Sequence, residues 1–197
     1  MITIPGQLSI KTIHGRNGDF NVGRLATNIG EFVIKNAELE QYSEGKYLGD
    51  FIITEIRPST YNTSGRMVIE IRAHLGGMAI ESIDNLSKEE ASQLSTQEVD
   101  PLDEETPVSV PQSPVDLSTE KIDPLTDTTP FGIQTPQTLA KEEQDDATLF
   151  SSLWPLGEIV KLDATVSRRL LRQQRDRLDA LGYTFKALSQ DWHLNAA

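Results

Sequence analysis

The chain contains no cysteine, few aromatic residues and no long apolar run. The absence of cysteine excludes disulfides, thiolate catalysis and zinc sites of the cysteine type. No apolar stretch of the 197 residues approaches the roughly 20 residues that a membrane-spanning helix needs. The first ten residues, "MITIPGQLSI", lack the basic region followed by an apolar region that marks a signal peptide. We therefore expect a soluble, cytoplasmic protein.

Recognisable catalytic motifs are also lacking. His14, His74 and His193 lie far apart in the sequence, and none has the spacing of a metal ligand or of a catalytic triad. The glycines of "GRNG", "EGKYLG" and "LGG" are not followed by the Gly-Lys-Ser/Thr ending that binds a nucleotide phosphate. We predict that the protein is not an enzyme and uses no cofactor and no metal.

The net charge of −12 is concentrated in the middle of the chain. Residues 1–85 carry 8 Lys and Arg against 10 Asp and Glu, and residues 150–197 carry 7 against 5. Residues 86–149 carry 3 against 15, a balance of −12. The acidity of the whole chain is therefore a poor guide to what its two ends bind.

The first 85 residues predict a small β-barrel. Apolar and polar residues alternate in five short runs between residue 7 and about residue 75, and Gly, Asn and Ser separate the runs. Five strands in so short a segment fit a five-stranded antiparallel barrel of the oligonucleotide-binding (OB) kind, with an SH3-like barrel as the alternative. Residues 58–65, "PSTYNTSG", are interpreted as the connection before the last strand.

The rest of the chain predicts an acidic linker and a small folded unit. Seven of the ten prolines fall between Pro101 and Pro136, among acidic, Ser and Thr residues, so we expect disorder over roughly residues 88–137. Residues 148–197 predict a β-α-β-β unit whose helix is capped by Asp163 or Thr165 and stops at Gly182. The domains are thus a barrel (1–85), a linker (86–147) and this unit, an α+β organisation overall. A unit so small is expected to dock on the barrel or on a second copy.

A near-repeat lies within the predicted linker. "VDPLDEETP" (99–107) and "IDPLTDTTP" (122–130) share an aliphatic residue, Asp-Pro-Leu, an acid and Thr-Pro. The similarity arises either from the biased composition or from two copies of an acidic docking peptide, in which Leu102 and Leu125 would enter a partner's pocket. "TDTTPF", ending at Phe131, resembles the acidic tail of bacterial single-strand-binding proteins, but it is internal and lacks their terminal carboxylate.

Basic and aromatic residues of the predicted barrel are the candidates for nucleic-acid binding. Barrels of the OB kind use cationic loops for phosphates and exposed rings for bases. The candidate residues are Arg16, Tyr47, Phe51, Arg57, Tyr61 and Arg66. In the alternative interpretation, Tyr47 and Phe51 are core residues and the arginines are ordinary surface charges. The near-neutral balance of the barrel argues against strong binding, because cations supply most of the affinity for a phosphate backbone.

The predicted carboxy-terminal helix has an arginine-rich face. At about 3.6 residues per turn, its apolar residues lie opposite a set of arginines. These arginines are Arg168, Arg169, Arg172 and Arg175. Pairing with Asp176 and Asp179 at i,i+4 would make the set a self-paired solvated surface. The alternative is a docking surface for the acidic linker or for DNA.

Two long stretches resemble a known family. "MITIPGQLSIKTIHGRNGDFNVGRL" with "EFVIK" and "GDFIITEIRPS", and the ending from "LWPLGEIVKLD" onward, resemble uncharacterised proteins encoded on proteobacterial integrative and conjugative elements. The resemblance covers both ends and omits the linker. It implies no catalytic or binding residue, but it implies a mobile-element context with nucleic-acid or transfer-machinery partners.

Two functions follow as hypotheses. In the first, the protein is a non-enzymatic accessory protein of a mobile element that binds single-stranded nucleic acid through the barrel. In the second, it is a protein–protein adaptor that contacts mobile-element or DNA-processing proteins through the linker motifs and the arginine-lined helix, with no nucleic-acid contact. The sequence leaves the oligomeric state open.

Overall fold

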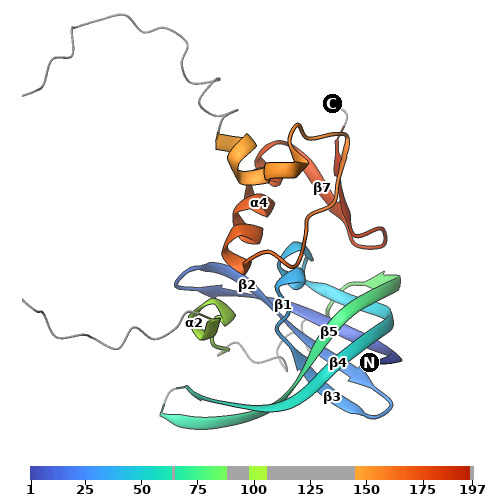
Figure 1. The fold of residues 1–197 in the computed structure, drawn as a ribbon. Helices are drawn as coiled ribbons and strands as arrows, with labels where there is room; N and C mark the ends of the chain where they lie inside the picture. The colour runs from blue at the N-terminus through green and yellow to red at the C-terminus, as the bar shows by residue number, and fades with distance from the viewer. Residues whose placement is uncertain (64, 88–97, 106–144, 196–197) are drawn as a thin grey trace, which may run out of the picture.

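A computed structural model describes residues 1–63, 65–87, 98–105 and 145–195 of the chain. Its largest part is a closed barrel of five strands in the order β1-β2-β3-β5-β4, with β4 pairing back to β1. The strands are β1 (Ile2–Gly15), β2 (Gly18–Thr27), β3 (Gly30–Ile34), β4 (Gly45–Thr63) and β5 (Arg66–Asp84). Figure 1 shows the barrel with the carboxy-terminal unit seated on one end of it.

The strand order confirms a barrel of the OB kind, with one correction to the prediction. β3 and β5 run parallel, so the barrel is mixed and not wholly antiparallel. The cause is the connection after β3, which contains the short helix η1 (Ala37–Gln41) and crosses the end of the barrel. β4 therefore begins beside β1, and the β4–β5 hairpin returns the chain to the free edge of β3.

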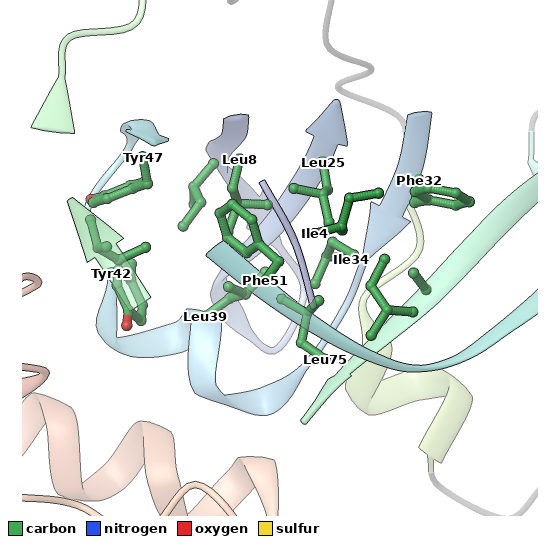
Figure 2. Close-up of a cluster of buried hydrophobic side chains, with 14 residues drawn as sticks. Ile4, Leu8, Leu25, Phe32, Ile34, Leu39, Tyr42, Tyr47, Phe51 and Leu75 are labelled. Atoms are coloured by element: carbon green, nitrogen blue, oxygen red, sulfur yellow. The ribbon is translucent and has the colours of Figure 1, made fainter. Parts of the chain in front are cut away.

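Alternation along the strands builds the barrel core. The even-numbered residues Ile4, Leu8 and Ile10 of β1 point inward, where they meet Leu25 and Ile34. Fourteen buried residues form this cluster. Figure 2 shows that the rings of Tyr42, Tyr47 and Phe51 belong to it as well. Burial of so many apolar side chains is what favours closure of the barrel.

β4 and β5 extend beyond the barrel as a long two-stranded arm. Cross-strand pairing continues from Arg57 with Arg72 to Thr63 with Arg66. The predicted connection over residues 58–65 is therefore wrong for residues 58–63, which belong to β4. In Figure 1 the arm passes below the short helix α2 (Pro101–Glu105).

The carboxy-terminal unit confirms the predicted β-α-β-β order. It consists of β6 (Ile159–Val160), α4 (Arg168–Ala180), β7 (Tyr183–Lys186) and β8 (Asp191–Leu194), with the sheet order β6-β8-β7. The cap of α4 differs from the prediction, because Oγ of Ser167 accepts a hydrogen bond from the Leu170 amide at 3.3 Å. Gly182, with φ of +87°, ends the helix as expected.

The carboxy-terminal unit docks on the barrel through η1 and its flanks. Trp192 is buried and donates its indole N–H to the Gln41 side chain at 3.0 Å. The rings of Tyr42 and Phe185 meet edge to face at 4.9 Å. Residues 145–150 are helical and, with η2 (Ser151–Leu153), complete the unit. Over the described ranges, the structure has no helix of the length and apolarity that crossing a membrane requires.

Part of the predicted disordered stretch is ordered. Residues 98–105, of sequence "EVDPLDEE", are described and include α2, and we call them the acidic segment. The prediction of disorder is wrong for these eight residues, because it weighed only the apolar area that they could bury. Their order comes instead from carboxylates that pair with cations of the barrel and of α4.

Candidate functional site

The outer face of β1, β2 and β3 carries a second apolar cluster. Ile13, Phe20, Val22 and Val33 have the opposite strand parity to the barrel core, so their side chains point out of the barrel. All four are nonetheless buried, and Phe20 is only 1% exposed. The guanidinium of Arg172 on α4 lies over the Phe20 ring, 6.0 Å from its centre. We call this surface the outer face.

Basic residues form a row across the outer face. Arg24 of β2 is in register with Val33 of β3, Val33 with Arg72 of β5, and Arg72 with Arg57 of β4. Residues in register across neighbouring strands point to the same side of a sheet. Lys35, two residues after Val33, extends the row along the same side. The register therefore brings basic residues from three strands, and Lys35 just after β3, together on one surface.

The acidic segment lies over this row and contacts it with its carboxylates. Glu98 is 3.1 Å from the Lys35 ammonium and 3.7 Å from the Arg24 guanidinium. Glu104 accepts two hydrogen bonds from Arg72, at 2.5 and 2.7 Å. Such paired contacts between arginine and carboxylate are among the strongest and most directional hydrogen bonds in proteins.

The contacts continue at the turn between β1 and β2. One carboxylate oxygen of Asp103 accepts hydrogen bonds from Asn17 at 2.9 Å and from Arg16 at 3.2 Å. Asp103 and Arg16 are both exposed, so this end of the acidic segment is the weaker one, since exposed ion pairs contribute little.

Tyr61 lies where the arm meets the acidic segment. Its hydroxyl donates to Glu98 at 3.2 Å, and the Lys35 ammonium is 4.9 Å from the centre of its ring. Burial, followed by the negative charges of Glu98 and Glu70, raises the pKa of Tyr61 to about 12. Glu70 of β5 also faces Lys35, at 3.2 Å. The side chains of Lys35, Glu98 and Glu70 are 5%, 2% and 7% exposed, so this part of the site is closed to water.

A buried ionic cluster ties the acidic segment to α4 and to the barrel. Oε1 of Glu40, on η1, accepts hydrogen bonds from Arg168 at 2.8 Å and from Arg172 at 2.9 Å. Arg172 also donates to both carboxylate oxygens of Asp100, at 2.9 and 3.2 Å. The Glu40 side chain is 0% exposed, and that of Asp100 is 4% exposed. Arg172 thus connects the barrel, the carboxy-terminal unit and the acidic segment.

The pKa values of two carboxyls in the acidic segment are lowered. Burial disfavours their charged form, but hydrogen bonds from Arg172 to Asp100 and from Arg72 to Glu104 outweigh it and hold both pKa values below the ordinary ones. A carboxyl whose pKa is lowered by folding stabilises the folded state fully when the pH is above its pKa in the unfolded chain. This contribution is lost as the pH falls through its pKa in the folded state.

We therefore expect an acid-sensitive contribution from the acidic segment. It should be complete above about pH 5 and decline below about pH 4, because unfolded Asp and Glu titrate at about 3.9 and 4.3. Urea unfolding at pH 7 and at pH 3 measures how much unfolding free energy is lost between the two pH values. This loss should be larger for the native chain than for the double variant Asp100→Asn with Glu104→Gln. Equal losses in the two proteins would contradict the contribution.

The structure separates the six candidate nucleic-acid-binding residues. Arg16 and Tyr61 contact the acidic segment, and Arg57 belongs to the basic row. The Arg66 side chain lies outside the described part of the chain. Tyr47 and Phe51 are 3% and 0% exposed in the barrel core, so the alternative interpretation holds for both rings. Strand parity turns them inward, where no base could stack on them.

The helix arginines do not form the solvated surface that the i,i+4 spacing suggested. Arg168 and Arg172 are buried against Glu40, and Arg175 donates to the Glu40 carbonyl at 3.0 Å. The reason is that α4 packs its apolar side on the carboxy-terminal sheet and its arginine side on η1. Arg169 is exposed.

Of the candidate docking peptide, the structure describes only residues 99–105 of the first copy. Leu102 lies half-buried within α2, and its amide donates to Asp100 at 3.0 Å. Leu125 and Phe131 lie outside the described residues. This part of the first copy therefore docks within its own chain, partly on the arginine side of α4. One of the two interpretations of the helix arginines was that they form a docking surface for the acidic linker.

Sequence reasoning missed most of the site. Arg24 and Arg72 lie within strands and Lys35 directly follows one, where single basic residues are common, and Phe20 fits the pattern of an ordinary core position. The alternation along β2 could have revealed part of it. Phe20, Val22 and Arg24 lie on one side of this strand, and the core residue Leu25 lies on the other. The register of β5 beside β3, which brings Arg72 to this side, could not be obtained from alternation alone.

A cavity of about 520 Å³ opens beside the basic row, between the barrel and the start of α4. Arg57, Arg72, Lys35, His74 and Arg168 are among its lining residues. Glu38 and Glu55 also line it, so its charge is mixed with an excess of basic groups. The cavity extends the cationic surface beyond the reach of the acidic segment.

The fold and the site define a class: a closed OB-type barrel whose outer cationic face is covered by an acidic segment of the same chain. Comparison with protein families places residues 2–194 in a family described as "Protein of unknown function (DUF3275)". The chain belongs to this family. No curated protein and no solved structure matches the chain.

Proposed function

We propose that the protein is a non-enzymatic accessory protein that binds single-stranded nucleic acid on the outer face of its barrel. The observation that carries the proposal is the cross-strand row of Arg24, Arg72 and Arg57, which shares the outer face of the barrel with the outward-pointing ring of Phe20. A single strand presents phosphates to cations and flat bases to apolar or aromatic side chains. The outer face supplies both, and in OB barrels the face of β2 and β3 is the usual ligand site.

Tyr61 and Lys35 add to this surface. Tyr61 lies on the same side of the β4–β5 hairpin as Arg57 and Arg72, so its ring borders the row. Cations held close to aromatic rings are common in single-strand sites, where the base stacks on the ring and the phosphate lies near the charge. The resemblance to proteins of integrative and conjugative elements leads us to expect a mobile-element context, in which single-stranded nucleic acid is a suitable ligand.

One observation favours a second candidate function, that of a protein–protein adaptor. The outer face already holds an acidic peptide, namely its own residues 98–105, so an acidic peptide of a mobile-element or DNA-processing protein is a chemically matched ligand. The arginine-lined helix gives this candidate less support, since Arg168 and Arg172 are buried within the chain.

Titration of the full-length protein with a fluorescent single-stranded oligonucleotide, at two salt concentrations, tests the proposal. Affinity should fall with salt, with a slope near −0.7 for each phosphate contact. Arg24→Gln and Arg72→Gln should each weaken binding and flatten the slope by about 0.7. Arg169→Gln is the matched control, because this exposed arginine of α4 lies outside the row, and it should leave the slope unchanged.

The same titration tests the ring of Tyr61. Tyr61→Ala should cost about 1–3 kcal/mol of binding free energy if a base stacks on the ring. Tyr61→Phe keeps the ring and loses only the hydrogen bond to Glu98, so it should bind at least as tightly as the native chain. Absence of binding by every one of these proteins at low salt would remove nucleic acid as the ligand and favour the adaptor.

A further inference from the structure

The acidic segment reproduces the chemistry of the ligand proposed above. Its sequence "EVDPLDEE" places five acidic residues in eight. Glu98 pairs with Lys35 and Arg24. Asp103 pairs with Arg16, and Glu104 pairs with Arg72. These are the barrel cations that would receive phosphates, so the segment and a nucleic-acid strand cannot occupy them together.

The acidic segment also reaches the apolar part of the outer face. Phe20, Val22 and Val33 point out of the barrel and are nevertheless buried. The ion pairs on either side, at Arg16 and at Lys35, place the segment across this surface, and Figure 1 shows α2 beside β2. The Arg172 guanidinium of α4 also lies over the Phe20 ring. Displacement of the segment would free the cations beside this apolar surface, and cations beside apolar groups are what a single strand requires.

We propose that residues 98–105 are a built-in competitor that occupies the nucleic-acid site of the same chain and must leave it before a single strand binds. The inference rests on the proposed function and concerns the regulation of that site. The ligand that displaces the segment is a polyanion long enough to contact several cations of the row, since a single phosphate would replace only one of its ion pairs.

With such a competitor, the apparent dissociation constant equals the intrinsic one divided by the fraction of molecules in which the site is open. If the segment is displaced in about one molecule in a hundred, the measured dissociation constant is about a hundred times the intrinsic one. Asp100, held by Arg172 in the buried cluster, keeps the segment close to the site when its other carboxylates are released. Neutralising Glu98 and Glu104 while keeping Asp100 should therefore open the site without detaching the segment.

The first test compares full-length Glu98→Gln with Glu104→Gln against the native chain. The double variant should bind a fluorescent single-stranded oligonucleotide at least about ten times more tightly, because it loses charge-assisted contacts worth roughly tenfold each. Glu158→Gln with Asp145→Asn makes the same change in net charge at two exposed positions of the carboxy-terminal unit and should change affinity much less. Thermal unfolding of both double variants shows whether each remains folded.

The second test keeps the acidic segment in place. The chain has no cysteine, so Asn17→Cys with Asp103→Cys introduces the only two thiols, at side chains in contact across the site. A short thiol-reactive crosslinker between them should lower the affinity for the oligonucleotide at least about tenfold, and the same protein without crosslinker should bind no more weakly than the native chain.

The outcomes separate the inference from the function on which it rests. Tighter binding by Glu98→Gln with Glu104→Gln alone, together with loss of binding after crosslinking, supports the inference. Equal gains in both charge-neutralised variants would overturn it in favour of a general charge effect. Unchanged affinity in both tests, with binding that still depends on Arg24 and Arg72, would overturn it and leave the proposed function intact. No binding by any variant would overturn both.

Discussion

Replacing Trp192 by alanine is expected to lower the free energy of unfolding by about 3–5 kcal/mol, the usual range for removing a large buried aromatic side chain. The ring is 2% exposed and packs with Leu171, Leu178 and Tyr183 in the core of the carboxy-terminal unit. It also contacts Phe185, at 5.4 Å between ring centres. Its loss would leave a cavity in a core that has few residues to fill it.

The same substitution should weaken the docking of the carboxy-terminal unit on the barrel. The indole N–H of Trp192 donates to Gln41, which follows the buried Glu40 on η1. The hydrogen bond and the packing are lost together, so the unit and the interface are destabilised in one step.

Urea unfolding followed by circular dichroism measures this effect. The other tryptophan of the chain, Trp154, provides the matched control, because it belongs to the same unit but is only half-buried. Trp154→Ala should cost clearly less than Trp192→Ala. Equal costs, or a cost below about 1 kcal/mol for Trp192→Ala, would mean that the hairpin of β7 and β8 is not the core of the unit.

The barrel could be predicted because its information is local. Period-two alternation in β1, β2 and β3 shows which residues point inward, and the Gly-rich breaks show where each strand stops. The parallel pairing of β3 with β5 could not be predicted in this way, since it depends on how the chain between residues 35 and 44 crosses the end of the barrel. The same non-local step decides that Arg72 lies beside Val33.

The ordered acidic segment shows a different limit of sequence reasoning. Composition correctly indicates that "EVDPLDEE" cannot form an apolar core of its own. It does not reveal that Arg24 of β2, Arg72 of β5 and Lys35, which follows β3, form a surface that binds the segment. Ion pairing requires no periodic pattern in the acidic segment or in the barrel residues that bind it. The pairing is therefore seen only in the folded structure, where the two parts of the chain are in contact.

The arginine side of α4 was misleading for a related reason. A face rich in arginine is usually solvated, and nearby aspartates made that interpretation adequate. The decisive partner, Glu40, is 128 positions from Arg168 in the sequence and lies on a short helix that alternation does not predict. A buried carboxylate on one element and two arginines on another are individually ordinary surface residues until the two elements pack.

Glu40→Gln is the second substitution for which we expect a large effect, a loss of about 3–5 kcal/mol in unfolding free energy. The replacement keeps the shape of the side chain and removes its charge. Arg168 and Arg172 would then remain buried, with side chains 2% and 8% exposed, without the carboxylate that both of them contact. Removing one member of a buried ionic cluster is costly mainly because the charges left behind cannot return to water.

Glu38→Gln is the matched control, because Glu38 lies two residues away on the same helix η1 and is only half-buried. Burial raises the pKa of the Glu38 carboxyl, which already disfavours its charged form, so replacing it by a neutral amide should cost little. Chemical unfolding of both variants at pH 7 measures the difference. A cost for Glu40→Gln no larger than that for Glu38→Gln would mean that the cluster contributes nothing to the docking of α4. Arg172 would then be free to bind Asp100 alone, and the acidic segment would be held by α4 with no help from the barrel at that point.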